Sequence, residues 1–133
     1  MKEDAQTRSR IMREVKSKDT TPELIVRRMV YAMGYRYRLH RKDLPGKPDL
    51  VFPKSHKALF VHGCFWHGHD CARGSRMPKT NTEYWRKKIG RNRIRDAANI
   101  AALKSEKWKV AVIWECELKE LLRIQKRLAR FLR

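Results

Sequence analysis

The chain has 133 residues and a net charge of +19, from 33 lysine and arginine residues against 14 aspartate and glutamate residues. This length favours one domain with its own hydrophobic core. The sequence has no apolar stretch long enough to cross a membrane, no apolar signal segment at its start, and three cysteines, an odd number that suits a disulfide framework poorly. We therefore expect a cytoplasmic, intracellular protein without a membrane anchor.

The excess of positive charge indicates a polyanionic partner. Solubility alone requires a net charge of only about 2–8, and a larger excess destabilises the folded chain by self-repulsion. Nucleic acid is the first candidate for that partner, and an anionic membrane surface is the second.

The first segment, residues 1–18, is polar and basic, and it predicts an arm in front of a single domain over residues 19–133. We expect this arm to contact the nucleic acid. Met12 is an apolar residue among the basic residues of the arm, and packing on the domain surface is the ordinary explanation for it.

The domain opens with Thr20, which predicts a hydroxyl cap on a helix that stops at Gly34. The alternation YRYRL over residues 35–39 then predicts a strand. Two apolar runs, residues 50–52 and 58–61, predict a β-hairpin.

The hairpin sets the partner of an acidic residue. If its centre lies between Ser55 and His56, Asp49 sits directly opposite His62. The spacing therefore predicts a carboxylate and an imidazole in contact, and a slip of one residue would weaken that contact.

The second half of the chain predicts a helix, a strand and a helix. The sequence TNTE from Thr80 predicts a capping box in front of a helix over residues 82–105, and residues 108–114 predict a central strand that is apolar on both faces. Residues 117–133 predict a basic amphipathic helix. The inward-facing side chains are expected to be Trp85, Ile89, Asn92, Asp96, Ile100 and Leu103 in the long helix, and Leu118, Leu121, Leu122, Leu128, Phe131 and Leu132 in the last one.

These elements predict an α/β fold in the order helix, three strands, helix, strand, helix, with a mixed sheet flanked by helices. The strand 58–61, the long helix and the strand 108–114 form a βαβ unit whose right-handed crossover makes the two strands parallel. Their carboxyl ends then meet at one edge of the sheet, where α/β proteins place their sites. We therefore expect Cys116 to lie beside Cys64.

All three cysteines belong to one candidate metal site. Cys64, His69, Cys71 and Cys116 form a Cys3His set, and four such ligands with no open position are typical of structural Zn²⁺. The alternative is three buried free cysteines. Zinc is favoured because the loop around the cysteines has little apolar content to hold it together.

A second metal is indicated by Asp49, which can hold Mg²⁺ together with the backbone carbonyl of Val61 and waters. A turn carboxylate after proline is the ordinary alternative. His62 and His67 can serve as base and as acid or phosphate-binding group, and Asp96 can orient one of them. The alternatives are that His67 exchanges roles with a zinc-ligating histidine, or that one imidazole is only a surface group.

Other residues of the same stretch are less decisive. Phe65 and Trp66 are adjacent aromatics in a loop, and either stack on bases or act as a wedge between base pairs, or else cap the core. His40 and His56 lie in basic loops, and we assign them no role.

Five motifs, PGKPD, FVHGCFWHGHDC, TNTEYWRKKIGRN, the pair Arg95–Asp96 and VIWEC, resemble the very-short-patch mismatch repair endonucleases. The resemblance runs in register over residues 7–118. It implies a restriction-endonuclease-like αβββαβ core and Mg²⁺-dependent nicking of one DNA strand, 5′ to the thymine of a T·G mismatch left by deamination of 5-methylcytosine. The E-x-K half-motif of many nucleases is absent, and the resemblance suggests that imidazole replaces its lysine.

The resemblance also implies roles for single residues. Asp49 and the Val61 carbonyl bind Mg²⁺, Glu23 helps through water, His62 and His67 activate water and assist phosphate chemistry, and Cys64, His69, Cys71 and Cys116 hold Zn²⁺. Phe65 and Trp66 wedge into the DNA from the major groove, and Met12 enters from the other side. The expected partner is double-stranded DNA with a T·G mismatch, bound by a monomer, with recruitment by mismatch-repair proteins left open.

Two other functions fit parts of the same pattern. One is a non-catalytic zinc-containing DNA-binding module, which has no need of Asp49, His62 and His67. The other is a related nuclease that acts on intact or differently damaged DNA.

Overall fold

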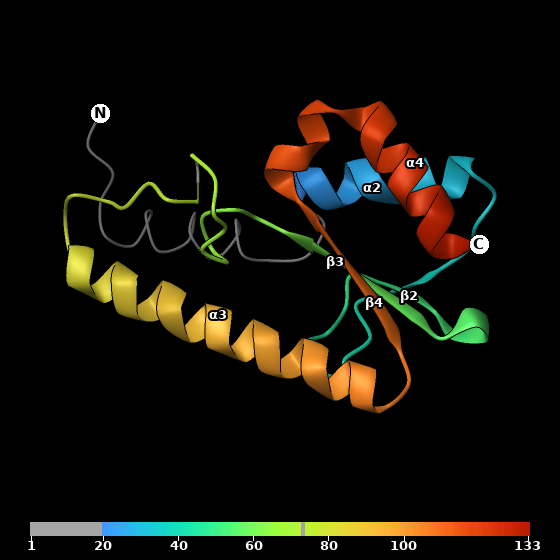
Figure 1. The fold of residues 1–133 in the computed structure, drawn as a ribbon, viewed down its shortest axis with the longest axis horizontal. Coiled ribbons are helices and arrows are strands. Elements are labelled where there is room, and N and C mark those ends of the chain that lie inside the picture. The colour runs from blue at the N-terminus through green and yellow to red at the C-terminus, as the bar shows by residue number, and fades with distance from the viewer. Residues whose placement is uncertain (1–19, 73) are drawn as a thin grey trace.

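A computed structural model describes residues 20–72 and 74–133, and it has a mixed α/β architecture (Figure 1). The elements in chain order are α2 (Thr21–Ala32), β1 (Arg38–Leu39), β2 (Leu50–Phe52), the 3-10 turn η1 (Pro53–Ser55), β3 (Lys57–His62), α3 (Thr82–Ser105), β4 (Lys109–Trp114), the 3-10 turn η2 (Glu115–Lys119) and α4 (Leu121–Leu132). This is the predicted order. The basic arm and its Met12 lie outside the described residues. Within the described ranges, no helix is both long enough and apolar enough to cross a membrane.

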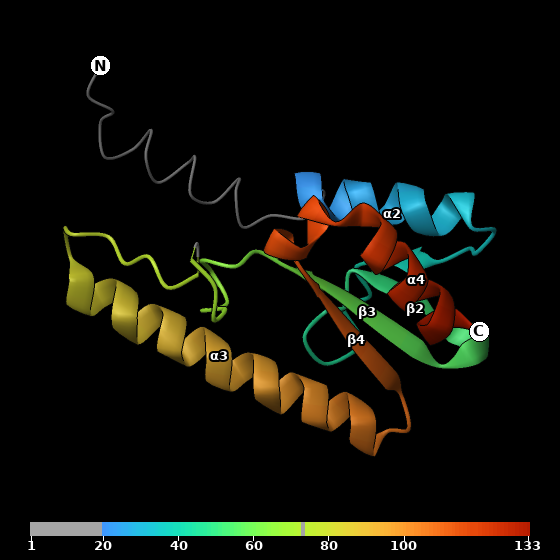
Figure 2. The same cartoon turned by 45° about the horizontal axis from the view of Figure 1, so that its top comes forward.

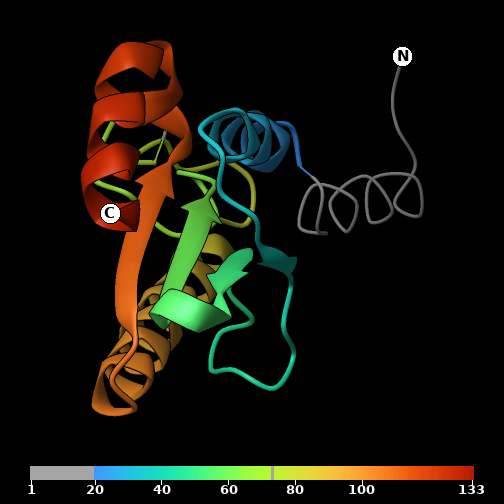
Figure 3. The same ribbon diagram turned by 90° about the vertical axis from the view of Figure 1, so that its right-hand side faces the viewer.

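The four strands form one sheet in the order β1-β2-β3-β4. The pairs β1–β2 and β2–β3 are antiparallel, and β3–β4 is parallel, with α3 as the crossover. The predicted parallel βαβ unit is therefore confirmed. The prediction that residues 108–114 form a central strand is wrong, because β4 lies at an edge of the described sheet (Figure 3).

The apolar sequence of β4 has a different cause. Helices cover both faces of the sheet, with α3 on one side and α2 and α4 on the other (Figures 1 and 2), so an edge strand here needs two apolar faces just as a central strand does. A polar group also reaches its edge, since Nη2 of Arg127 donates to the carbonyl oxygen of Val112 at 3.0 Å.

The hydrophobic core is divided between the two faces of the sheet. Alternation along the strands sends one set of side chains toward α2 and α4 and the other toward α3. The cluster on the side of α2 and α4 contains Val26, Val30, Leu50, Phe52, Leu59, Val61, Ile113, Ile124, Leu128 and Leu132. The cluster on the side of α3 contains Leu44, Val51, Ala58, Phe60, Leu103 and Trp108. Both faces of the sheet are therefore packed against helices, and this packing holds in place the strand ends that carry a site.

The β2–β3 hairpin has a different register from the one predicted. Phe52 pairs with Lys57, so its centre lies between residues 54 and 55 rather than between 55 and 56. The cause is the connection, because η1 is followed by His56 in the left-handed conformation with φ 57°. Continuing this register places Asp49 opposite Phe60, not opposite His62, and the predicted direct pairing is wrong.

The first helix begins and ends as predicted. The backbone N–H of Glu23 donates to the Thr20 hydroxyl at 3.4 Å, and Gly34 takes φ 96°. The amides of Gly34 and Tyr35 donate to the carbonyls of Tyr31 and Val30, which is the Schellman arrangement. The strand that follows is shorter than predicted, because only Arg38–Leu39 pairs with β2.

The last two helices differ from the predictions at their starts. The residue before α3 is Asn81, with φ 57° and no side-chain cap, so the predicted capping box is wrong; the Thr82 hydroxyl instead donates to the carbonyl of Pro78 at 2.8 Å. At the C-terminus, η2 precedes α4, which buries Ile124, Leu128 and Leu132. Leu121 and Leu122 are exposed, contrary to prediction, because the turn at η2 shifts the helix phase.

Candidate active site and metal centres

A cavity of about 1080 Å³ opens at the edge of the sheet where β3 and β4 end. Its walls come from α2, the start of β2, the end of β3, the following loop and α3. The predicted residues that line it are Glu23, Asp49, Val61, His62, Phe65, Trp66, His67 and Asp96. Residues from five separate segments therefore meet in one space, although Asp49 and His62 are not strand partners.

The first centre of this cavity is built on Asp49. Its Oδ2 accepts a hydrogen bond from the backbone N–H of Val61 at 2.7 Å, which fixes the carboxylate against β3. Glu23 projects from the first turn of α2 and is buried. Asp49 and Glu23 thus come from different elements and share one wall of the cavity.

A third residue of this centre, His40, was assigned no role from the sequence. Its Nε2 lies 2.8 Å from Oε2 of Glu23, and its backbone N–H donates to the carbonyl of Asp49 at 3.2 Å. One ligand atom from each of Glu23, His40 and Asp49 lies within 4.8 Å of the others. The β1–β2 pairing that produces this contact spans only two residues on β1, and so brief a strand leaves no pattern in the sequence that points to His40.

The electrostatics of this centre favour a cation. Burial raises the pKa of the Asp49 carboxyl to about 7, and the neighbouring carboxylate of Glu23 acts in the same direction. Two acidic groups so close together favour a shared proton or a bound cation over two free charges.

The second centre is a pair of imidazoles. The rings of His62 and His67 stack at 3.8 Å with an interplanar angle of 3°, and Nδ1 of His67 lies 2.5 Å from Oδ2 of Asp96 on α3. His62 is buried at the end of β3, and its Nδ1 finds no hydrogen-bond partner among the described residues. The structure therefore pairs Asp96 with His67, whereas His62 lines the cavity with its Nδ1 buried and unpaired among the described residues.

The charge state of this pair is asymmetric. Burial lowers the pKa of His62 to about 3, and the proximity of His67 acts in the same direction. His62 is consequently neutral at physiological pH. His67, in contrast, contacts the carboxylate of Asp96, which can balance a proton taken up by that ring.

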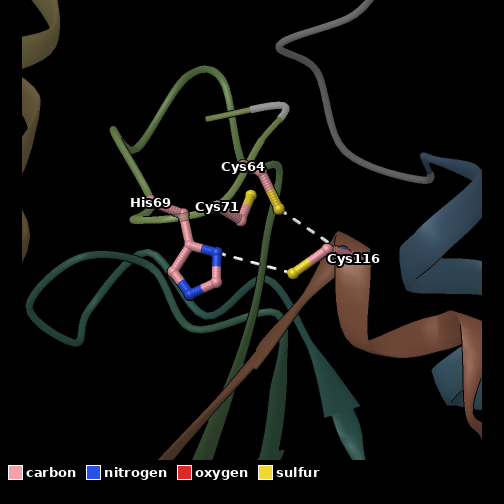
Figure 4. Close-up of side chains that lie close together, drawn as sticks. All are labelled: Cys64, His69, Cys71 and Cys116. Carbon is pink, nitrogen blue, oxygen red and sulfur yellow. Dashed lines mark hydrogen bonds between the residues drawn. The ribbon is translucent and has the colours of Figure 1, made fainter. Parts of the chain in front are cut away.

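The third centre lies beside the cavity and contains all three cysteines (Figure 4). One ligand atom from each of Cys64, His69, Cys71 and Cys116 lies within 4.8 Å of the others. Nδ1 of His69 is 3.5 Å from Sγ of Cys116, whose backbone N–H donates to Sγ of Cys64 at 3.3 Å. The predicted juxtaposition of Cys116 with Cys64 is confirmed.

The loop after β3 is folded tightly around these ligands. The amides of His69 and Cys71 donate to the carbonyls of Cys64 and His69 at 3.0 and 2.9 Å. Gly74 is required here, because a Cβ at this position would overlap the carbonyl oxygen of His69. Its N–H donates to Sγ of Cys71 and lowers the pKa of that thiol to about 7, whereas burial raises the pKa of Cys64 to about 12.

One aromatic residue connects the second and third centres. Trp114, the last residue of β4, pairs with His62 in the parallel register. The His69 ring stacks on Trp114 at 4.0 Å, and the His62 ring meets Trp114 edge-on at 5.1 Å. The cysteine cluster and the imidazole pair therefore pack against the same tryptophan ring.

An aromatic rim is formed by Phe65 and Trp66, which line the cavity, and by Trp85, which packs against both of them. Phe65 and Trp66 form an edge-to-face pair at 5.1 Å, and Trp85 of α3 lies 5.7 Å from each of them. Trp85 was predicted only as a buried helix residue, but it is half-buried and belongs to this group. The Asn92 side chain donates to the carbonyl of Trp66 at 3.0 Å and ties the loop to α3.

Comparison with known proteins gives concordant matches. A family model described as "DNA mismatch endonuclease Vsr" matches residues 2–73. The type II nicking enzyme V.XorIIP of Xanthomonas oryzae pv. oryzae is 53% identical over 122 residues, 92% of this chain and 89% of that protein. The type II nicking enzyme V.NmeAIP of Neisseria meningitidis is 44% identical over 126 residues (95% and 89%), and the DNA mismatch endonuclease Vsr of Escherichia coli is 39% identical over 116 residues (87% and 74%).

Proposed function

The chain belongs to the family of Vsr DNA mismatch endonucleases and is a DNA endonuclease, and from this premise we propose that it nicks one strand of double-stranded DNA 5′ to the thymine of a T·G mismatch. Its biological role would then be the repair of deaminated 5-methylcytosine. We further propose that its sheet is a restriction-endonuclease-like core, to which the order of the elements corresponds. Family membership sets aside the non-catalytic zinc module.

The observation that carries this proposal is the meeting of the carboxylate centre and the imidazole pair in one cavity. A nuclease needs a site for a divalent cation and a base for the attacking water. The two centres supply one each, from different elements of the fold.

The carboxylate centre fits Mg²⁺ in its donor chemistry. Asp49 and Glu23 supply oxygen ligands, which this hard cation requires. We propose that Asp49 and the carbonyl of Val61 bind the Mg²⁺ ion directly, and that Glu23 binds it through a water molecule. When bound, Mg²⁺ would act as a Lewis acid on the phosphate.

The backbone supports Val61 as a ligand. In the β2–β3 register, Val61 faces Pro48, because Leu59 pairs with Leu50. Proline has no N–H to donate, so the ladder bond that the Val61 carbonyl would accept there cannot form. The amide of Val61, in turn, is used by the Asp49 carboxylate. Pro48 therefore frees one carbonyl for a cation at the end of the strand.

The imidazole pair suits proton transfer. The Asp96 carboxylate fixes the orientation of the His67 ring and stabilises its protonated form, so His67 can take the proton of the attacking water. His62 stays neutral and can accept a hydrogen bond from water or orient the phosphate. We propose these two roles for the pair.

The cysteine cluster fits a structural Zn²⁺. Three thiols and one imidazole form a closed four-ligand set with no position left for water. We propose that zinc bound here holds the loop between β3 and α3. Because His69 stacks on Trp114, and Trp114 contacts His62, the zinc would also help to hold the His62 ring in position.

DNA binding would use the basic surface and the aromatic rim. Lys42, Lys47 and Arg95 line the cavity and can contact phosphates. Phe65 and Trp66 are proposed to wedge between base pairs from the major groove, with Met12 of the arm entering from the other side. We propose a monomer, with mismatch-repair proteins as recruiting partners.

An Asp49→Ala variant tests the assignment of the catalytic centre. We expect it to bind T·G duplex with ordinary affinity but to nick it at no measurable rate in Mg²⁺. Asp43→Ala is the matched control, since Asp43 is an exposed carboxylate that pairs with Arg41 outside the cavity lining. Nicking by Asp49→Ala at the wild-type rate would remove Asp49 from the mechanism.

A further inference from the structure

The carboxylate centre contains a nitrogen ligand that magnesium chemistry does not require. One ligand atom from each of Glu23, His40 and Asp49 lies within 4.8 Å of the others. The contact between Nε2 of His40 and Oε2 of Glu23, 2.8 Å, is close to the separation of about 3 Å expected for adjacent ligands at metal distances of 2.0–2.2 Å. The three side chains are therefore spaced as neighbours in one coordination sphere.

His40 is held in this position by its backbone. Its φ is 47°, a left-handed conformation that is uncommon outside glycine but that histidine, like asparagine and aspartate, adopts more often than most residues. Its N–H donates to the carbonyl of Asp49, so the backbone of one acidic residue fixes the imidazole that touches the other.

The imidazole is not needed to satisfy Glu23 by itself. Arg27, one helical turn further along α2, already donates to Oε2 of Glu23 at 3.2 Å. Mg²⁺ takes oxygen ligands and gains nothing from an imidazole. First-row transition cations accept nitrogen and oxygen ligands together, with an affinity that rises from Mn²⁺ toward Cu²⁺.

We propose that His40, with Glu23 and Asp49, directly ligates a divalent first-row transition cation, so that the metal preference of this enzyme extends beyond Mg²⁺. The proposal rests on the proposed function, because it concerns the same catalytic centre. It makes His40 a residue that determines metal specificity, and not only a hydrogen-bonding partner of Glu23.

Manganese is the suitable probe for this site. It is the weakest binder of the transition series, so it does not displace zinc from the thiolates of the cysteine cluster, and it is paramagnetic. The zinc-loaded protein would be titrated with Mn²⁺ by electron paramagnetic resonance. Electron spin-echo envelope modulation would then report whether a nitrogen atom is bound to the ion.

We expect nitrogen modulation in the wild-type protein and its loss in His40→Gln. The Mn²⁺ affinity of this variant should fall about tenfold or more, while its Mg²⁺ affinity changes little. His56→Gln is the matched control, because His56 is also left-handed, with φ 57°, but its ring stacks on Trp108 and its Nε2 contacts the carbonyl of Glu106, so it does not belong to the group of Glu23, His40 and Asp49. His40→Asn, which tolerates the left-handed backbone, serves as the second variant if His40→Gln unfolds at a lower temperature.

The absence of nitrogen modulation in the wild-type protein would overturn the proposal, as would its persistence in His40→Gln and His40→Asn. His40 would then only hold Glu23 through the hydrogen bond. Nicking in Mg²⁺ is measured separately on T·G duplex. A wild-type protein that nicks but shows no bound nitrogen contradicts this inference alone, and one that binds Mn²⁺ through nitrogen but does not nick contradicts the proposed function alone.

Discussion

Nδ1 of His67 lies 2.5 Å from Oδ2 of Asp96, and the two residues are 29 positions apart in the chain. The loop after β3 carries the imidazole, and α3 carries the carboxylate. The bond fixes which nitrogen of His67 faces Asp96, and therefore which one faces the cavity. Proton transfer by His67 should depend on this contact.

Replacement of Asp96 tests this dependence. Asp96→Asn keeps the shape of the side chain but removes its charge and favours the wrong ring tautomer. Because positioned general bases contribute about 10²–10⁴-fold, we expect single-turnover nicking to fall about 10²-fold or more, with unchanged Mg²⁺ affinity. Glu83→Gln, an exposed position on the same helix, is the control. An unaffected rate in Asp96→Asn would show that His67 does not act through this carboxylate.

The raised pKa of Asp49 predicts how stability depends on pH in Mg²⁺-free buffer. The folded-state pKa, about 7, lies above the ordinary value of 3.8, so folding favours the neutral acid. Its contribution to stability is complete below about pH 4 and is lost as pH rises through 7. Asp49→Asn should therefore stabilise the Mg²⁺-free protein at pH 8 by about 1–2 kcal/mol and have little effect at pH 4.

Urea unfolding of the zinc-loaded protein at the two pH values measures this difference. Added Mg²⁺ should restore the wild-type protein at pH 8 and leave the variant unchanged. Equal effects of Asp49→Asn at both pH values would mean that Asp49 is ionised throughout.

The cysteine cluster gives a prediction that does not touch a ligand. Gly74→Ala introduces a Cβ that overlaps the carbonyl oxygen of His69, so the loop must move away from its sulfur and imidazole groups. We expect less than one zinc per chain by elemental analysis and a loss of stability of about 2 kcal/mol or more. Gly90→Ala on α3 is the control, since nothing lies within 4 Å of its added Cβ, and it should be stabilised by up to about 1 kcal/mol. Full zinc occupancy in Gly74→Ala would contradict the claim that the close packing of Gly74 against His69 holds the zinc ligands in place.

The aromatic rim should determine selectivity for a mismatch. Stacking on a base is worth about 1–3 kcal/mol per base, so Phe65→Ala, Trp66→Ala and Trp85→Ala should each reduce the preference for T·G over T·A duplex about fivefold or more. Fluorescence anisotropy with the two duplexes measures the ratio. Tyr31→Ala is the control, because Tyr31 is an exposed aromatic on α2. An unchanged ratio in Phe65→Ala and Trp66→Ala together would exclude the wedge.

Much of the fold follows from local sequence signals. The helix from Thr20 to Gly34 and the crossover of α3 were predictable because caps and handedness rules act over short distances. The same handedness rule brought Cys116 to Cys64. The chemistry of three thiols and one imidazole, together with this topology, pointed to one cluster.

The errors lie where a turn or a helix phase depends on tertiary context. The hairpin register depends on the left-handed conformation of His56. The residues around His56 do not predict that conformation. β4 has the composition of a central strand because helices cover both of its faces. Composition reflects this burial, but it does not show whether a strand has a neighbouring strand on one side or on both. His40 was missed since a two-residue strand and one backbone hydrogen bond place it beside Asp49.

The central claim is mismatch-dependent nicking, and a panel of duplexes measures it most directly. Zinc-loaded protein and Mg²⁺ would be incubated with end-labelled duplexes that differ only in one base pair, T·G, T·A or C·G, in several flanking sequences. We expect a single nick 5′ to the thymine of the T·G pair and none on the matched duplexes. Cleavage of matched and mismatched duplexes at equal rates, or no cleavage of T·G duplex in any flanking sequence, would contradict the account.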